Sequence, residues 1–352
     1  MNNEMNINNN PYTLMFGMEP RESISRVIQK AEVINAFSKG IPPQQIFMIM
    51  GVRGCGKTVF MTEVEKEFRN NEEWIVVDLN SSKDMLKALV AKLGSLNKLA
   101  SIFQKANINL SLFGIGIEVS NSVPIVDSEV ALIEMLESLN KHKKKVLITI
   151  DEVTPTNYMR EFASAFQIIV RQKLPVYLLM SGLYENINSI QNKDNITFLF
   201  RAPKIELKSL NLGVIVDNYK KNFRISEEEA LKMARLTKGY GYAFQLLGYC
   251  TWNEGGNLEK AIKKYKSCLE DYVYEKIWSG LSNNDKRLAF GIAKSETGKV
   301  GDIRNIINMP LNNYSKYRER LMKQGFIEGS EYGYLSFTLP FFEEYVLRMY
   351  EQ

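Results

Sequence analysis

Eight consecutive residues, Gly51-Val-Arg-Gly-Cys-Gly-Lys-Thr58, match the spacing G-x-x-x-x-G-K-[ST]. Glycines at this spacing let backbone N–H groups converge on a phosphate, the lysine reaches its outer oxygens, and the threonine hydroxyl is a ligand for Mg²⁺. The alternative interpretation is an ordinary glycine-rich turn. We expect a site for ATP and Mg²⁺ formed by the motif and the residue after it: Gly51, Val52, Arg53, Gly54, Cys55, Gly56, Lys57, Thr58 and Val59.

Two adjacent carboxylates, Asp151 and Glu152, come at the end of the apolar run KVLITID. A carboxylate at the end of a buried strand beside a phosphate loop can hold Mg²⁺ together with Thr58. The neighbouring Glu152 is placed to orient or deprotonate an attacking water. A solvated turn is the alternative, but the upstream motif favours a Walker A and Walker B pair that hydrolyses ATP.

Two further residues are candidates for the same chemistry. Ser181 ends the apolar run VYLLMS, where its hydroxyl could contact the γ-phosphate or the attacking water. Arg201 follows the apolar segment ITFLF and could act as an arginine finger on a neighbouring copy's nucleotide or on its own. An ordinary strand-end serine and an ordinary surface arginine remain the alternatives.

These residues need an alternating arrangement of strands and helices to bring them together. Short buried strands are predicted over 45–50, 74–79, 145–151 and 176–181, with a fifth over 201–207. Helices are predicted between them, beginning with one over 22–39, and the period-two pattern of 109–119 suggests an inserted hairpin. The pattern predicts an α/β fold, a parallel P-loop sheet with helices on both faces.

The chain after about Leu212 changes character. Helices alone are predicted over 212–222, 226–237, 243–252 and 258–279, which form an all-helical lid. Three shorter helices, over 283–293, 300–307 and 312–324, precede a hairpin that turns near residues 329–331. This order is typical of a winged helix-turn-helix domain. We therefore predict a tail at 1–10 that is disordered, an ATPase core at 11–210, a lid at 211–281 and a winged helix at 282–352.

Basic residues gather on the predicted winged helix. Residues 299–323 hold six basic side chains (Lys299, Arg304, Lys316, Arg318, Arg320 and Lys323) against two acidic ones. Tyr314 and Tyr317 interleave with the last four, a combination that suits phosphate and groove contacts with double-stranded DNA. Winged helices also bind proteins, and the whole tail is nearly neutral, so this alternative stays open.

Composition excludes several other classes of protein. One histidine and three scattered cysteines argue against histidine chemistry, a disulfide framework and a zinc site. No secretory leader and no run of about 18 apolar residues is visible, so we expect no membrane span and a cytoplasmic location.

With these motifs in place, the chain resembles an AAA+ ATPase of the origin-recognition/initiator and STAND-like clade. The segment Asn10-Pro-Tyr-Thr-Leu-Met-Phe-Gly17 resembles the part that lies near adenine in such ATPases, and residues 239–248 resemble their lid segment. Ala243 stands where proline is usual, Ser181 where asparagine or threonine is commoner, and no arginine begins the lid helix. The resemblance implies an ATP-driven molecular switch, and assembly into a homo-oligomer would bring Arg201 toward a neighbour's γ-phosphate.

Three functions are compatible with this organisation. The first is an ATP-dependent switch that binds DNA through its winged helix, with Arg201 acting in trans. The second is a STAND-like signalling or scaffold ATPase whose winged helix binds protein. The third, a P-loop kinase or small-molecule transferase, is disfavoured because such enzymes seldom need this tail.

Overall fold

The computed structural model describes residues 9–15, 20–40, 42, 44–115, 117, 123–192, 197–329 and 333–351. Its contacts divide the chain into two compact units. The sheet unit comprises Ser25–Met50 and Lys57–Glu206. The helical unit comprises the residues before Ser25, the segment Gly51–Gly56, and everything from Leu207 onward.

The sheet unit is built on five parallel strands in the order β2-β3-β4-β1-β5. They are β1 (Ile46–Met50), β2 (Trp74–Leu79), β3 (Lys145–Ile150), β4 (Val176–Gly182) and β5 (Lys204–Glu206). Every residue of β1 and β4 is buried, as expected for central strands of a parallel sheet covered on both faces. The predicted α/β class is confirmed. The fifth strand is shorter than predicted because residues up to Arg201 form a 3-10 turn, η3 (Thr197–Arg201).

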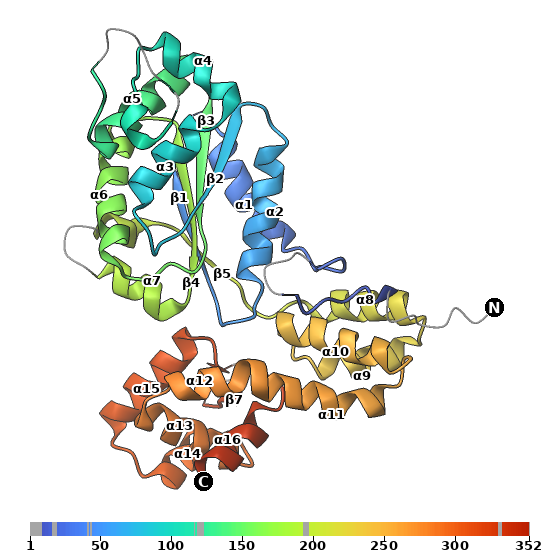
Figure 1. Cartoon of the computed structure of the whole chain (residues 1–352). Helices are drawn as coiled ribbons and strands as arrows, with labels where there is room; N and C mark the ends of the chain where they lie inside the picture. The colour runs from blue at the N-terminus through green and yellow to red at the C-terminus, as the bar shows by residue number, and fades with distance from the viewer. Residues whose placement is uncertain are drawn as a thin grey trace. The chain divides into compact units, whose positions relative to one another are not determined.

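Helices cover both faces of this sheet (Figure 1). They are α1 (Val27–Ser38), α2 (Lys57–Arg69), α3 (Met85–Gly94), α4 (Asn97–Lys105), α5 (Ser128–Lys141), α6 (Asn157–Arg171) and α7 (Tyr184–Gln191). On the side of α1 and α2 an aromatic cluster forms, with Phe37 on Phe47 and Phe68 on Trp74 at ring-centroid distances of 5.4 and 4.3 Å. On the other side α3, α5 and α6 pack aliphatic side chains onto the strands.

The hairpin predicted over 109–119 is not seen in the described part of that range. Ser111–Phe113 form a 3-10 turn, η2, that ends at Gly114 in the left-handed conformation (φ 70°). One ladder-like bond joins the Leu110 amide to the Ile117 carbonyl at 3.1 Å, while Gly116 and residues 118–119 lie outside the described residues. Glycine at the turn explains why a period-two pattern does not extend into two strands here.

The register of the central strands determines which side chains meet at the edge of the sheet. Ile150, the last residue of β3, pairs with Met180 of β4. The next residues along the two chains, Asp151 and Ser181, therefore lie beside each other at the carboxyl edge. This is the edge at which ligands bind in open α/β sheets.

The helical unit begins with α8 and continues to the end of the described chain. Its elements are α8 (Leu212–Phe223), α9 (Glu227–Arg235), α10 (Gly241–Asn253), α11 (Leu258–Leu269), η4 (Glu270–Tyr274), α12 (Glu275–Gly280), α13 (Asn283–Lys294), α14 (Val300–Ile307), α15 (Leu311–Lys323), β6 (Ile327–Glu328), β7 (Ser336–Phe337) and α16 (Phe342–Tyr350). Ser226 and Glu229 form a capping box at the start of α9. Helix α16 was not predicted.

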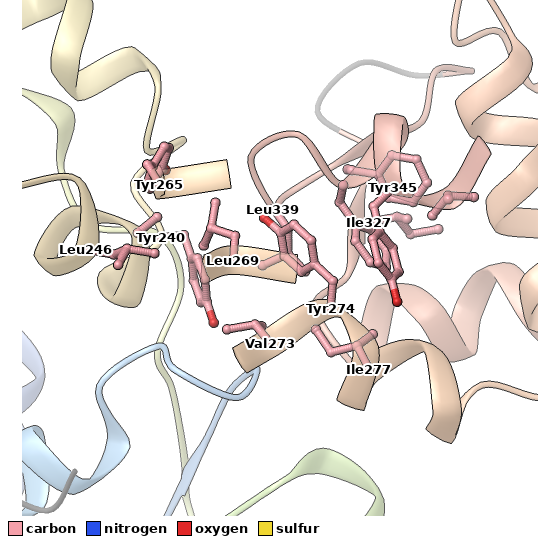
Figure 2. Close-up of a cluster of buried hydrophobic side chains, with 14 of the residues drawn as sticks. Tyr240, Leu246, Tyr265, Leu269, Val273, Tyr274, Ile277, Ile327, Leu339 and Tyr345 are labelled. Carbon is pink, nitrogen blue, oxygen red and sulfur yellow. The ribbon is translucent and has the colours of Figure 1, made fainter. Parts of the chain in front are cut away.

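The long helix predicted over 258–279 contains a π-helical segment, η4. The extra residue in each turn rotates the helix, so that Val273 and Tyr274 face the core while Tyr272 is exposed. Figure 2 shows the result: buried side chains run from Tyr240 and Leu246 through Leu269 and Val273 to Ile327, Leu339 and Tyr345. One hydrophobic core therefore joins the region predicted as lid to the region predicted as winged helix.

The N-terminal segment differs from the predicted domain boundary. Tyr12 was placed with the ATPase core, but it lies 1% exposed in the core of the helical unit, stacked on Phe223 and edge-on to Phe244. Its hydroxyl donates to Asn218 at 2.8 Å. The predicted disordered tail falls mainly on residues 1–8, outside the described residues, whereas Asn10 donates to the Tyr249 carbonyl. The aromatic side chain of Tyr12 is thus a core residue of the helical unit.

Within the described ranges, no helix combines the length and apolar character needed to cross a bilayer.

Candidate nucleotide-binding site and C-terminal surface

The Walker B carboxylate Asp151 is held by three donors at the carboxyl edge of the sheet. The Thr58 hydroxyl, in the first turn of α2, donates to its Oδ2 at 2.6 Å. The Ser181 hydroxyl donates to its Oδ1, which also accepts from the Glu152 amide at 3.0 Å. These bonds fix the orientation of the carboxylate and hold it beside the hydroxyl of Thr58.

Ser181 occupies the predicted place but is oriented differently from the prediction. Its side chain is completely buried (0% exposed), and its oxygen also accepts from the Glu152 amide at 3.3 Å. A hydroxyl enclosed in this way contacts Asp151 rather than an attacking water. We therefore interpret Ser181 as a residue that positions the Walker B carboxylate.

Glu152 has a strained backbone at the centre of the candidate site. Its φ of 51° lies in the left-handed region, which is uncommon for a residue other than glycine, asparagine or aspartate. The conformation is maintained on both sides, since the Glu152 amide bonds Asp151 and the Val153 amide donates to the Ser181 carbonyl at 2.8 Å. The Glu152 side chain is exposed and has no partner within the described residues, so its carboxylate is available for a water molecule.

The loop Gly51–Gly56 has the conformation that its glycines allow. Gly54 and Gly56 have φ of 75° and 96°, and Cys55 is buried. The amide N–H groups of Gly54 and Gly56 donate to no acceptor among the described residues. Lys57 and Val59 follow in the first turn of α2, where the N-terminal amides of a helix and the helix dipole favour an anion.

Other residues of the same helical unit form hydrogen bonds with this loop. The sequence did not predict these contacts. Tyr240 donates its hydroxyl to the Arg53 carbonyl at 2.6 Å, and the Tyr242 amide donates to the Gly54 carbonyl at 2.9 Å. A Cβ added to Gly325 would lie 2.9 Å from the side chain of Val52. The Val52 side chain of the loop therefore also contacts the segment before β6. The sequence Gly239-Tyr-Gly-Tyr pointed to a lid, but nothing in it indicated a contact with the loop.

Two described side chains, those of Thr58 and Asp151, provide oxygen atoms that fit a magnesium ion bound together with a nucleotide. Among the residues the structure describes, no group of three or more His, Cys, Asp or Glu side chains could hold a metal alone. Mg²⁺ typically takes one or two protein oxygens and completes its shell with water and substrate phosphates. The converging oxygens of Thr58 and Asp151 match this pattern.

A second carboxylate pair lies behind the Walker B residue, between α2 and the sheet. The Thr149 hydroxyl donates to Asp78 at 2.5 Å, and Arg69 bonds both Asp78 and Glu65, at 3.1 and 3.3 Å. Burial raises the pKa of Glu65, and the nearby Asp78 carboxylate raises it further. Burial also acts to raise the pKa of Asp78, but the hydrogen bonds from Thr149 and Glu65 and the charge of Arg69 lower it overall.

Arg201 ends η3 as an exposed side chain. In the part of the chain that the structure describes, its guanidinium makes no ion pair or hydrogen bond. Beside it, Phe200 is 60% exposed, with the Lys204 ammonium 5.4 Å from its ring centre. The structure thus does not bring Arg201 to Asp151 by any recorded contact, and its predicted role concerns a neighbouring copy.

The predicted basic surface of residues 299–323 is only partly available. Lys299, Lys316 and Lys323 are exposed, but Arg320 forms an ion pair at 3.1 Å with Asp285, which is fully buried. Tyr314 is a core residue at 3% exposure, and Tyr317 accepts a bond from Asn284 at 2.9 Å. The sequence pattern could not distinguish the exposed residues from the buried or paired ones, because positions four apart on one helix differ in burial only through their packing partners.

The start of α15 exposes polar groups that the charge pattern did not reveal. Asn312, Asn313 and Ser315 are exposed next to Lys316, and Leu311 is 56% exposed. The two-stranded sheet of β6 and β7 follows this helix, with an isolated bridge between Lys299 and Tyr334 beside it. Three helices and two antiparallel strands therefore occur where they were predicted, while the predicted turn near 329–331 falls mainly outside the described residues.

The chain was compared with proteins of known structure. It aligns with a structure described as the Walker-type ATPase PABY2304 of Pyrococcus abyssi at 15% identity and a TM-score of 0.66, covering 96% of this chain and 99% of that one. The chain therefore shares the fold of this Walker-type ATPase structure. The predicted resemblance is thus confirmed as a likeness of fold.

Two further structures match the chain at lower similarity. Cdc6p from Pyrobaculum aerophilum matches at 13% identity and a TM-score of 0.49, covering 96% of this chain and 98% of that one. The Aeropyrum pernix ORC1 protein, solved in complex with DNA, matches at 13% identity and a TM-score of 0.43, covering 96% and 94%.

Sequence comparisons add one match. A family model described as a domain of unknown function (DUF8462) matches residues 271–346, from within η4 to within α16. No curated protein sequence matches the chain significantly. The matched region comprises α12–α15 and the strands β6 and β7, together with parts of η4 and α16.

Proposed function

We propose that this protein is an ATP-dependent switch of the AAA+ class, which hydrolyses ATP and binds double-stranded DNA through a winged helix formed by α13–α15 and the β6–β7 hairpin. The observation that carries the ATPase part is the convergence of Thr58 and Asp151 at 2.6 Å, with Ser181 and the Glu152 amide completing the arrangement. The AAA+ fold and the complete Walker A motif support it.

Each residue has a defined role in this proposal. The free amides of Gly54 and Gly56, together with Lys57, bind the phosphates, and Thr58 and Asp151 hold Mg²⁺, which neutralises charge on the β- and γ-phosphates. Glu152, with its exposed and unpaired carboxylate, orients the attacking water and receives its proton. Arg201 stabilises the charge that develops on the γ-phosphate of a neighbouring copy, which requires an oligomer.

Support for DNA binding comes from the start of α15. In helix-turn-helix proteins the N-terminal residues of the recognition helix reach base edges, and asparagine can pair with adenine there. Asn312, Asn313 and Lys316 are exposed at this position, while Lys299 lies beside the hairpin strand through its bridge to Tyr334.

A specific observation favours a second function, the STAND-like scaffold that binds protein. Leu311 and Ile306 are exposed apolar residues on α15 and α14, at 56% and 39%, and Arg320 is engaged with Asp285. An apolar surface of this kind suits a protein partner better than phosphates.

Nucleotide titration and turnover assays test the proposal. Wild-type protein should bind ATP with Mg²⁺, Lys57→Ala should lose binding, and Glu152→Gln should bind but not hydrolyse. Duplex DNA should bind saturably, with affinity that falls steeply as salt rises. Absence of ATP binding would remove the ATPase proposal, and DNA-independent turnover without salt-sensitive binding would favour the scaffold.

A further inference from the structure

The Walker A loop is held by a buried tyrosine of the helical unit. Tyr240 is 4% exposed, and its hydroxyl donates to the Arg53 carbonyl at 2.6 Å. Burial raises the pKa of this hydroxyl well above its ordinary value, so it remains a neutral donor. The contact is close: a Cβ added to Gly54 would lie 2.3 Å from the Tyr240 oxygen, so only glycine fits beside it.

A neighbouring backbone contact acts on the next peptide of the loop. The Tyr242 amide donates to the Gly54 carbonyl at 2.9 Å, and a Cβ on Gly241 would already lie 3.3 Å from the carbonyl oxygens of Gly54 and Cys55. Tyr240 and Tyr242 therefore hold two successive carbonyls of the loop. These contacts lie within one compact unit, because Gly51–Gly56 group with the residues from Leu207 onward.

The geometry of the peptide bond converts these contacts into amide orientation. The C=O and N–H of one trans peptide are coplanar and point in opposite directions. Holding the Arg53 carbonyl against Tyr240 therefore points the Gly54 N–H away from the tyrosine, and that N–H has no acceptor among the described residues. An amide fixed in advance loses no freedom when an anion binds, which is the basis of preorganised binding.

We propose that Tyr240 is a positioning residue of the Walker A loop: its hydroxyl fixes the Arg53–Gly54 peptide so that the Gly54 amide faces the nucleotide phosphates. This inference rests on the proposed ATP binding and adds a residue to it. This positioning role belongs to the segment that leads into α10, the predicted lid helix. The sequence has no arginine at the start of that helix to contact the nucleotide.

The packing around Tyr240 links this role to the rest of the helical unit. Its ring belongs to the core that Figure 2 shows continuing through Tyr265, Leu269 and Tyr274 to Ile327, which lies in β6. A change in the loop that displaces Tyr240 therefore disturbs packing shared with the C-terminal helices, because well-packed cores transmit displacement.

Tyr240→Phe tests the proposal because it removes the hydroxyl and keeps the ring. Tyr265→Phe is the matched control, since Tyr265 is buried in the same core and donates to another carbonyl, that of Leu236, at 2.9 Å. Loss of one hydrogen bond weakens binding by about three- to tenfold. We expect this loss of affinity for ATP in Tyr240→Phe, and wild-type affinity in Tyr265→Phe.

Thermal unfolding without nucleotide separates positioning from general damage. Both variants lose a buried hydrogen bond and should unfold at similarly lowered temperatures. If Tyr240→Phe binds ATP as wild type does, or if both variants lose affinity equally, the positioning role is wrong. If the wild-type protein binds no ATP although its spectrum shows that it is folded, the proposed ATP binding itself is wrong. This result differs from both outcomes for the variants, so the two proposals fail in distinguishable ways.

Discussion

The hydroxyl of Thr58 donates to the carboxylate of Asp151 across 2.6 Å, although the two residues are separated by 93 positions in the chain. This bond joins the first turn of α2 to the end of β3 and defines where a nucleotide-bound Mg²⁺ can be coordinated. Removing either oxygen should therefore affect the metal before it affects the fold. We expect Thr58→Ala and Asp151→Asn to raise the Mg²⁺ concentration needed for half-maximal turnover, by about tenfold or more. Equal Mg²⁺ dependence in wild type and both variants would contradict this site.

Ser181 should affect catalysis more than binding. Its buried hydroxyl orients Asp151, so Ser181→Ala is expected to lower kcat by about tenfold and to leave KM for ATP nearly unchanged. Ser138→Ala, at another buried serine on α5, is the control for general loss of packing. A Ser181→Ala enzyme with a raised KM and unchanged kcat would instead indicate contact with the nucleotide itself.

Arg201 should act on a neighbouring molecule. Arg201→Ala keeps its own nucleotide site, and Lys57→Ala keeps its arginine, so neither should hydrolyse ATP well alone. Mixing the two should restore part of the activity, since one kind of interface then contains both an intact site and an intact arginine. Arg171→Ala, an exposed arginine at the end of α6, should behave as wild type. No recovery in the mixture would exclude action in trans.

The C-terminal surface predicts opposite effects for two cations on α15. Lys316→Ala should weaken DNA binding, reduce the slope of log affinity against log salt by about one, and leave stability unchanged. Arg320→Ala should leave Asp285 buried without its cation and lower the free energy of unfolding by about 2–4 kcal/mol. Denaturant unfolding and DNA titration of both variants separate the two roles. The assignment fails if Lys316→Ala destabilises the fold while Arg320→Ala does not.

The carboxylate pair behind the site predicts a pH effect on stability. Glu65 has a folded-state pKa raised above its ordinary 4.5, so its contribution is fully present below that pH and is lost as pH rises through the folded value. Glutamine mimics the protonated form and can still donate to Asp78. We expect Glu65→Gln to unfold with about 0.5–1.5 kcal/mol more stability than wild type at neutral pH. The advantage should disappear near pH 4, and an unchanged difference across this range would contradict the assignment.

The parts of the fold that were predictable are those with strong local signals. β1 and β4 are continuous apolar runs followed by turn residues, and the Walker A motif lies between a strand and a helix as its chemistry requires. The capping box at Ser226 likewise defined the start of α9. One site could be predicted for Asp151, Glu152 and Thr58, because the carboxyl ends of parallel strands lie at one edge of a sheet.

What could not be predicted depends on long-range packing. The burial of Tyr12 and Tyr314 and the ion pair of Arg320 follow from partners far away in sequence, and no local pattern distinguishes these residues from exposed neighbours. The π-helical turn at Glu270–Tyr274 is invisible to a periodicity of 3.6 residues. Tyr240 escaped notice for the same reason, since its acceptor, Arg53, lies 187 positions earlier.

The central claim, an ATP-gated DNA-binding switch, is tested most directly by DNA affinity in two nucleotide states. We would titrate duplex DNA into Glu152→Gln protein at fixed salt, with and without Mg²⁺ and ATP, and repeat the titration with Lys57→Ala. The account predicts that ATP changes DNA affinity by about fivefold or more in Glu152→Gln and has no effect in Lys57→Ala. Linkage requires DNA to change ATP affinity by the same factor. Equal DNA affinity with and without bound ATP would contradict the account.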